Sequence, residues 1–170
     1  MQVSRRQLLV GTTAVAAVAA VVGVGAGLLW LPAPAAGWRV LSAGEAVAVT
    51  RLAEALFPPG NPLGVSGGDV DLAPVVDDLL GDQLDDKVAP VFRYLLRAVE
   101  DFTFASRGVG FGALSVTDRV DVLRHWDDES LYPRRVAYDV IRLVMGMAFF
   151  NLPQVVTRIG WQSRCTLGSS

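Results

Sequence analysis

A long apolar run from Leu8 to Leu31 stands directly behind two adjacent arginines, Arg5 and Arg6. As a helix, this run would be roughly 36 Å long at about 1.5 Å per residue, enough to cross a hydrocarbon core of about 30 Å. Positive charge before an apolar stretch is common to export signals and membrane anchors. The sequence therefore divides into an N-terminal leader, residues 1–36, and one further domain, residues 37–170.

The residues around the two arginines resemble a twin-arginine export signal. Ser4, Arg5, Arg6 and Leu9 match that pattern, and Leu8 stands where a phenylalanine is more usual. Glycines, threonines and alanines dilute the apolar run and lower its affinity for lipid, which favours this route over an ordinary secretory signal. The twin-arginine translocase carries folded proteins, so we expect folding, or binding of a loaded partner, before export.

A candidate processing site follows the apolar run. Ala33-Pro34-Ala35 has the small-x-small form of a signal cleavage site, and Pro32 and Pro34 end the preceding helix. We therefore expect cleavage after Ala35. Retention of the leader as a membrane anchor is the alternative.

The domain behind the leader is acidic. The chain has 15 Lys and Arg residues against 17 Asp and Glu, and two of the basic residues, Arg5 and Arg6, lie in the leader. No basic tract occurs outside the leader, which disfavours DNA or RNA binding. A domain of about 130 residues buries a sufficient core without cross-links. Cys165, the single cysteine, cannot form an internal disulfide.

Apolar residues recur at helical spacing through the domain, which predicts an all-α fold, a compact bundle of about five helices. Ser42 and Glu45 form a capping box at the first helix, and Asp71 and Ser115 are candidate caps of later helices. We expect a loop over Pro58–Gly68. The predicted helices run from Ser42 to about Phe57, Leu72 to Leu84, Val88 to Gly108, Ser115 to Trp126 and Pro133 to Phe150.

Two patterns within these helices carry expectations about burial. Arg93 and Arg97 mark the polar face of the third helix, and the adjacent acids Asp77 and Asp78 are expected to be solvated. The segment Leu143–Phe150 is apolar on all sides. That places it in the centre of the bundle or against a partner.

Few residues suit catalysis. A Cys–His nucleophile pair is not expected, because Cys165 lies near the end of the chain, far from His125. His125, Asp127, Asp128 and Glu129 offer metal ligands, but consecutive carboxylates on a helix point in different directions, so we prefer a solvated helix end. No haem or iron–sulfur ligand set is present in the sequence. We expect no redox chemistry from this chain alone.

Phenylalanines and glycines near the third helix also allow two readings. Phe102, Phe104 and Phe111 could line a small-molecule site, but we expect them to belong to the helix core. The glycines of Gly108–Gly112 follow a helix rather than a strand, so they do not predict a dinucleotide site.

Several short segments together carry a family resemblance. They are the leader arginines, Leu41–Glu45 with Leu56–Pro59, the helix from Leu114 to Trp126, and Phe149–Pro153 followed by Ile159–Trp161. In these segments the chain resembles the gluconate 2-dehydrogenase subunit 3 family. Members are small exported subunits that accompany a large flavin-dependent dehydrogenase of the glucose-methanol-choline type, often with a cytochrome c subunit. The chain departs from the family at Gly160-Trp161-Gln162-Ser163, where a Gly-Tyr-rich segment is common.

The resemblance implies a non-catalytic, chaperone-like accessory subunit in the periplasm or cell envelope. It would bear the export signal, help the catalytic subunit mature and hold no cofactor itself, with FAD in the partner. Phe149, Phe150 and Trp161 are the candidate docking residues, because large aromatics often dominate binding energy. Closing the domain's own core is an equal alternative for Phe149 and Phe150. Two other functions stay open: a stand-alone membrane-anchored helical envelope protein with a structural or binding role, and a metal-dependent enzyme.

Overall fold

The computed structural model describes residues 31–128 and 132–160, and within these residues all regular structure is helical. This confirms the predicted all-α class. Six α-helices are present in the described part of the chain, together with a π-helical segment, η2, and a short 3-10 turn, η3. In chain order the elements are α3 (Ala43–Leu56), α4 (Ala73–Asp78), η2 (Leu79–Gln83), α5 (Val88–Arg107), η3 (Phe111–Ala113), α6 (Val116–Trp126), α7 (Tyr132–Phe150) and α8 (Pro153–Ile159).

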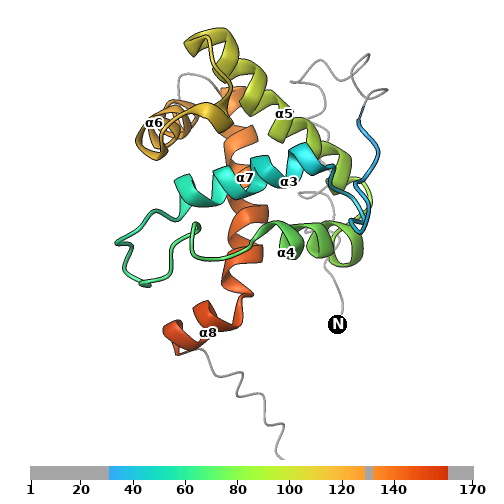
Figure 1. Ribbon diagram of the computed structural model, residues 1–170, viewed down its shortest axis with the longest axis vertical. Coiled ribbons are helices and arrows are strands. Elements are labelled where there is room, and N and C mark those ends of the chain that lie inside the picture. Colours follow the sequence, from blue (N-terminus) through green and yellow to red (C-terminus); the bar gives the residue numbers. More distant parts are fainter. Residues whose placement is uncertain (1–30, 129–131, 161–170) are drawn as a thin grey trace, which may run out of the picture.

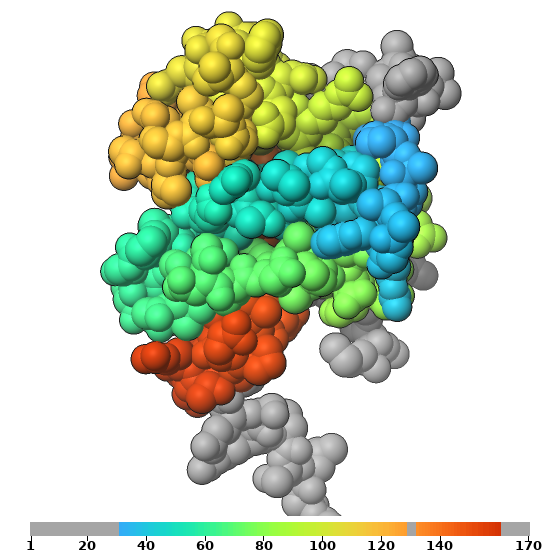
Figure 2. All heavy atoms as spheres, in the orientation of Figure 1, coloured from blue at the N-terminus to red at the C-terminus, as the bar shows by residue number. Residues whose placement is uncertain are grey.

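Helix α7 is the central helix of the bundle. It runs along the long axis of the molecule, with α5 and α6 near one end, α8 at the other, and α3 and α4 crossing it (Figure 1). It contacts α4, α5, α6 and α8. In the space-filling view, α3 and α4 lie side by side and cover much of α7 on that face (Figure 2). A helix so surrounded is expected to be rich in apolar residues, as α7 is.

One hydrophobic core joins the helices. The α5 residues Phe92, Leu95, Leu96 and Val99 recur at spacings of three and four, and all are buried. Such spacing places them along one side of the helix. The largest fully buried side chains of the described residues are Phe92, Phe111, Phe149, Leu41, Leu52, Leu72, Leu79, Leu80, Leu95, Leu96, Ile141 and Met145.

Local signals set the helix ends. The Ser42 amide donates to the Glu45 carboxylate at 2.7 Å, and the Ser42 hydroxyl accepts from the Glu45 amide at 3.4 Å, so the predicted capping box is confirmed. The Ser115 hydroxyl accepts from the Asp118 amide at 3.2 Å. Gly108 ends α5 at φ +75°, a left-handed conformation that glycine adopts without a Cβ penalty.

The second and last predicted helices differ from the structure. The predicted Leu72–Leu84 helix splits into α4 and the π-helical η2. The prediction of Asp71 as its cap is wrong: Leu72 occupies the cap position and no side chain caps the helix. Helix α8 was not predicted; it begins at Pro153, a residue that is well tolerated at a helix start.

The three phenylalanines near α5 have different environments. Phe111 is buried in the core, as expected. The expectation is wrong for Phe102 and Phe104, which are 48% and 63% exposed. Thr103, between them, is buried, so the buried face of α5 passes between these two side chains.

Candidate partner-binding surface

Apolar side chains open to solvent line one face of α7. Leu143, Gly146, Met147 and Phe150 are spaced by three, four and seven residues, which places them on one side of a helix. Leu143 is 62% exposed, Met147 38% and Phe150 48%. A Cβ added at Gly146 would meet no atom within 4 Å, so the space above it is open. We call these four residues the outer stripe.

The opposite side of the same segment is core. Val144, Met145, Ala148 and Phe149 are all buried. One side of the all-apolar segment Leu143–Phe150 therefore packs within the bundle, and the other faces outward. Contact of that outer side with a partner stays a prediction.

The two candidate aromatic residues at the end of α7 have different environments. Phe149 is 0% exposed, and its ring stacks on Phe57 with centroids 3.9 Å apart and planes 6° apart. The prediction that Phe149 contacts a partner is therefore wrong, because its ring is used up in the core. Phe150 lies edge-on to Phe149 at 5.7 Å and stays about half exposed. Phe150 remains available for docking.

Helix α8 leaves the end of α7 at an angle of 84°. Within the described residues no single helix has the length and hydropathy of a membrane span; α7 and α8 have them only when taken together across this bend. Ile159, near the end of α8, is 45% exposed. Trp161 lies outside the described residues, so its role in docking stays a prediction.

The residues of the export signal also lie outside the described part of the chain. They are Ser4, Arg5, Arg6, Leu8 and Leu9. The twin-arginine assignment therefore stays a prediction from sequence.

The candidate cleavage residues are described. Ala33 is exposed, and Ala35 is partly buried. The Ala35 amide donates to the Leu41 carbonyl and its carbonyl accepts from the Trp38 amide, each at 3.0 Å. Gly37 lies within the turn that these two hydrogen bonds close, and its φ is +85°. The peptide bond after Ala35 is thus the first peptide bond inside a hydrogen-bonded turn. Its cleavage stays a prediction.

A buried carboxylate holds the chain just after this turn. Asp77 of α4 is only 4% exposed, which corrects the prediction that it is solvated. Its oxygens accept from the backbone amides of Arg39, Val40 and Leu41 at 2.8–2.9 Å. Three such donors satisfy a charge that would otherwise be costly to bury. Asp78 is exposed, as predicted, and lies 3.6 Å from Arg39.

Arg93 of α5 is the second buried charge. Its Nε lies 2.9 Å from the Glu45 carboxylate, and its Nη2 donates to the Pro32 carbonyl. The prediction that Arg93 lies on the solvated face is wrong, because Glu45, 48 residues earlier, draws it inward. The α3 capping box and the first described residues are therefore tied to α5 through one guanidinium.

Arg119 of α6 forms the third such contact. It is 5% exposed, bonds to the Glu54 carboxylate of α3, and donates to the Leu114 carbonyl at 3.0 Å. Arg51 approaches the same carboxylate at 3.0 Å. Burial raises the pKa of Glu54, but hydrogen bonds from Arg119 and Arg51 outweigh it and lower that pKa below its ordinary value. We call Asp77, the Glu45–Arg93 pair and the Glu54–Arg119 pair the polar anchors.

The described candidates for metal ligands, His125, Asp127 and Asp128, do not form a metal-binding group. Among the described residues, no three His, Cys, Asp or Glu side chains are close enough to hold a metal ion. The His125 Nδ1 lies 2.7 Å from the Asp121 carbonyl of its own helix. Asp127 and Asp128 are exposed, and Glu129 lies outside the described residues, as Cys165 does.

Comparison of the chain with known proteins finds no similar protein. No protein-family model matches the chain, and no curated protein and no solved structure is similar to it. The outer stripe is therefore interpreted from its own geometry.

Proposed function

We propose that this chain is a non-catalytic small subunit of an exported flavin-dependent dehydrogenase of the glucose-methanol-choline type. It assists export, maturation and stability of the large subunit, which carries FAD, and a cytochrome c subunit completes the complex in some cases. The twin-arginine translocase is its route across the cytoplasmic membrane. The proposal rests on the leader, on the motif resemblance and, among the described residues, on the outer stripe.

The outer stripe is the observation that carries the proposal. Leu143, Met147 and Phe150 lie along one face of α7, whose other face fills the core. Contiguous apolar surface on a soluble domain usually marks an interaction site, since removing it from water is favourable by about 25 cal/mol per Å². Helical anchors at such spacing are typical of a helix face that docks on a partner.

Photo-crosslinking from the stripe tests the proposal. A photoreactive amino acid is placed at Met147 in the full-length protein, expressed in its native host, and the crosslinked products are identified by mass spectrometry. Val47 on α3 is the matched control, because it is also apolar and exposed, at 57%, but belongs to a different helix from the stripe. We expect a flavoprotein dehydrogenase at Met147 and little or none at Val47.

Two outcomes would overturn the proposal. Equal flavoprotein yields at the two positions would show that capture is not specific to the stripe. A protein that retains its leader in the membrane and captures no flavoprotein would favour the stand-alone, membrane-anchored alternative.

A further inference from the structure

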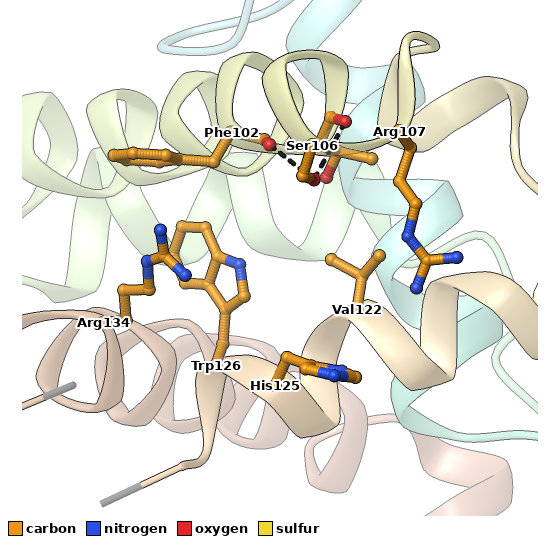
Figure 3. Close-up of a pocket in the computed structure, with 8 residues that line it drawn as sticks. Phe102, Ser106, Arg107, Val122, His125, Trp126 and Arg134 are labelled. Carbon is orange, nitrogen blue, oxygen red and sulfur yellow. Dashed lines mark hydrogen bonds between the residues drawn. The ribbon is translucent and has the colours of Figure 1, made fainter. Parts of the chain in front are cut away.

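A cavity of about 250 Å³ lies between α5 and α6, away from the outer stripe. Aromatic and basic side chains make up much of its lining, and none of the described residues that line it is acidic (Figure 3). This lining is unusual for a chain whose acidic residues outnumber its basic ones. The residues that matter here are Phe102, Arg107, His125, Trp126 and Arg134.

Trp126 contributes an unpaired donor to the cavity. Its side chain belongs to the core and is only 4% exposed, yet its indole nitrogen faces the cavity (Figure 3). No hydrogen bond joins that nitrogen to a described residue, and since no buried side-chain nitrogen or oxygen of these residues lacks a partner, the nitrogen is open to the cavity. The position in front of the nitrogen therefore suits an acceptor that the chain does not supply.

Two guanidinium groups add positive charge at the same place. Arg134 lies over the Phe102 ring, 5.1 Å from its centroid, and Arg107 lies across the cavity from it (Figure 3). Neither arginine forms an ion pair with an acidic side chain of the described residues. Arginine binds carboxylates through two parallel hydrogen bonds, so an unpaired pair of guanidinium groups favours such a ligand.

The aromatic rings in the cavity wall favour a small ligand with an aromatic part. The rings of Phe102 and Trp126 meet edge to face at 5.9 Å, and Phe102 is about half exposed. A second, more apolar cavity of about 130 Å³ shares Phe102, Trp126 and Arg134. Drug-sized ligands occupy roughly 300–1,000 Å³, so this cavity is limited to a smaller molecule.

We propose that the cavity binds a small aromatic carboxylate, with its acid group between Arg107, Arg134 and the Trp126 indole N–H and its ring against Phe102. This site is separate from the proposed docking surface. It does not depend on the dehydrogenase assignment.

Titration with benzoate tests this site directly. The full-length protein, labelled with ¹⁵N, is titrated with benzoate while the Trp126 indole resonance is followed, and benzyl alcohol serves as the uncharged analogue. We expect saturable movement of that resonance with benzoate and at least tenfold weaker binding of benzyl alcohol. Equal affinity for the two compounds, or an indole resonance that does not move, would overturn the proposal.

Arginine variants test whether Arg107 and Arg134 bind the carboxylate. Arg134→Gln and Arg107→Gln should each weaken benzoate binding at least fivefold while leaving the melting temperature unchanged, because neither arginine forms an ion pair with another described residue. Arg124→Gln is the matched control, because Arg124 lies on α6 near the cavity but is exposed and pairs with Asp121 at 3.1 Å. Unchanged affinity in both test variants, or an equal loss in Arg124→Gln, would refute the assignment.

Discussion

The polar anchors and the outer stripe place their side chains in opposite environments. The polar anchors bury charges where α3, or the segment just before it, meets α4, α5 and α6, and each charge has its partner within the chain. The outer stripe exposes apolar side chains, and nothing in the described chain covers them. Removing one partner of a buried charge pair destabilises the folded domain. Exposed apolar area adds little to folding and instead marks a surface for contact with another molecule. The two regions should therefore respond differently to mutation.

The largest contrast is expected between neighbouring phenylalanines. Phe149→Ala should lower the free energy of unfolding by about 3–5 kcal/mol, because it leaves a cavity beneath Phe57. Phe150→Ala should cost less than about 1 kcal/mol, since its ring is half exposed. Urea denaturation of both variants measures the difference. Equal losses would mean that the stripe is part of the core.

The next effect concerns Asp77. Asp77→Ala leaves three backbone amides without their acceptor and should destabilise the domain by about 2–4 kcal/mol. Asp78→Ala is the control, with an expected change within about 0.5 kcal/mol, because Asp78 is solvated. Thermal and urea unfolding give both values. A mild Asp77→Ala variant would contradict the assignment of Asp77 as an anchor.

Breaking the Glu54–Arg119 pair should cost about 2–3 kcal/mol. Arg119→Met removes the main partner of a carboxylate that stays partly buried, and Arg51 compensates only in part. The double variant Glu54→Met with Arg119→Met should recover much of the loss, because no unpaired charge remains. If the double variant is less stable than the sum of the single losses, charge pairing is not the cause.

Polar substitution in the outer stripe should affect binding and spare the fold. Met147→Ser should weaken association with the flavoprotein partner by about 1–2 kcal/mol and change the stability of the isolated chain by less than about 0.5 kcal/mol. Val47→Ser on α3 should leave binding unchanged. Affinity by surface plasmon resonance and melting temperature by calorimetry separate the two effects. A destabilised Met147→Ser variant would contradict the division between the two regions.

The smallest expected effect is a dependence of stability on pH through Glu54. Its folded-state pKa lies below the ordinary value of 4.5, so this carboxylate stabilises the fold above that pH. The contribution is lost as the pH falls through the lowered pKa. The melting temperature should therefore fall less steeply below pH 4.5 in Arg119→Met than in the wild type. Parallel curves for the two proteins would rule out this contribution.

Local sequence signals predicted much of the helical framework. The capping box at Ser42, the cap at Ser115 and the end at Gly108 depend on neighbouring residues, so they are visible in the sequence. Helical spacing likewise predicted the buried side of α5. These features need no knowledge of how the helices pack.

The errors arose where burial depends on a distant partner. Arg93 and Asp77 look like surface charges until Glu45 and the amides near Leu41 come into contact with them. Phe149 and Phe150 are indistinguishable in an all-apolar segment, since such a segment has no periodic pattern that marks one side as inner. The cavity at Trp126 was missed for the same reason: its arginines and aromatics come from three helices.

The bond between Arg93 and the Pro32 carbonyl has a mechanical consequence. Pro32 directly follows Leu31, the last residue of the apolar run, so the described chain is bonded to α5 at its second residue. A pull from the N-terminus would load this bond first, then the hydrogen bonds of Ala35 with Leu41 and Trp38, and then the amides held by Asp77. Traction at the N-terminus would thus be shared among successive hydrogen bonds before it acts on Leu41, the first core residue of the described chain.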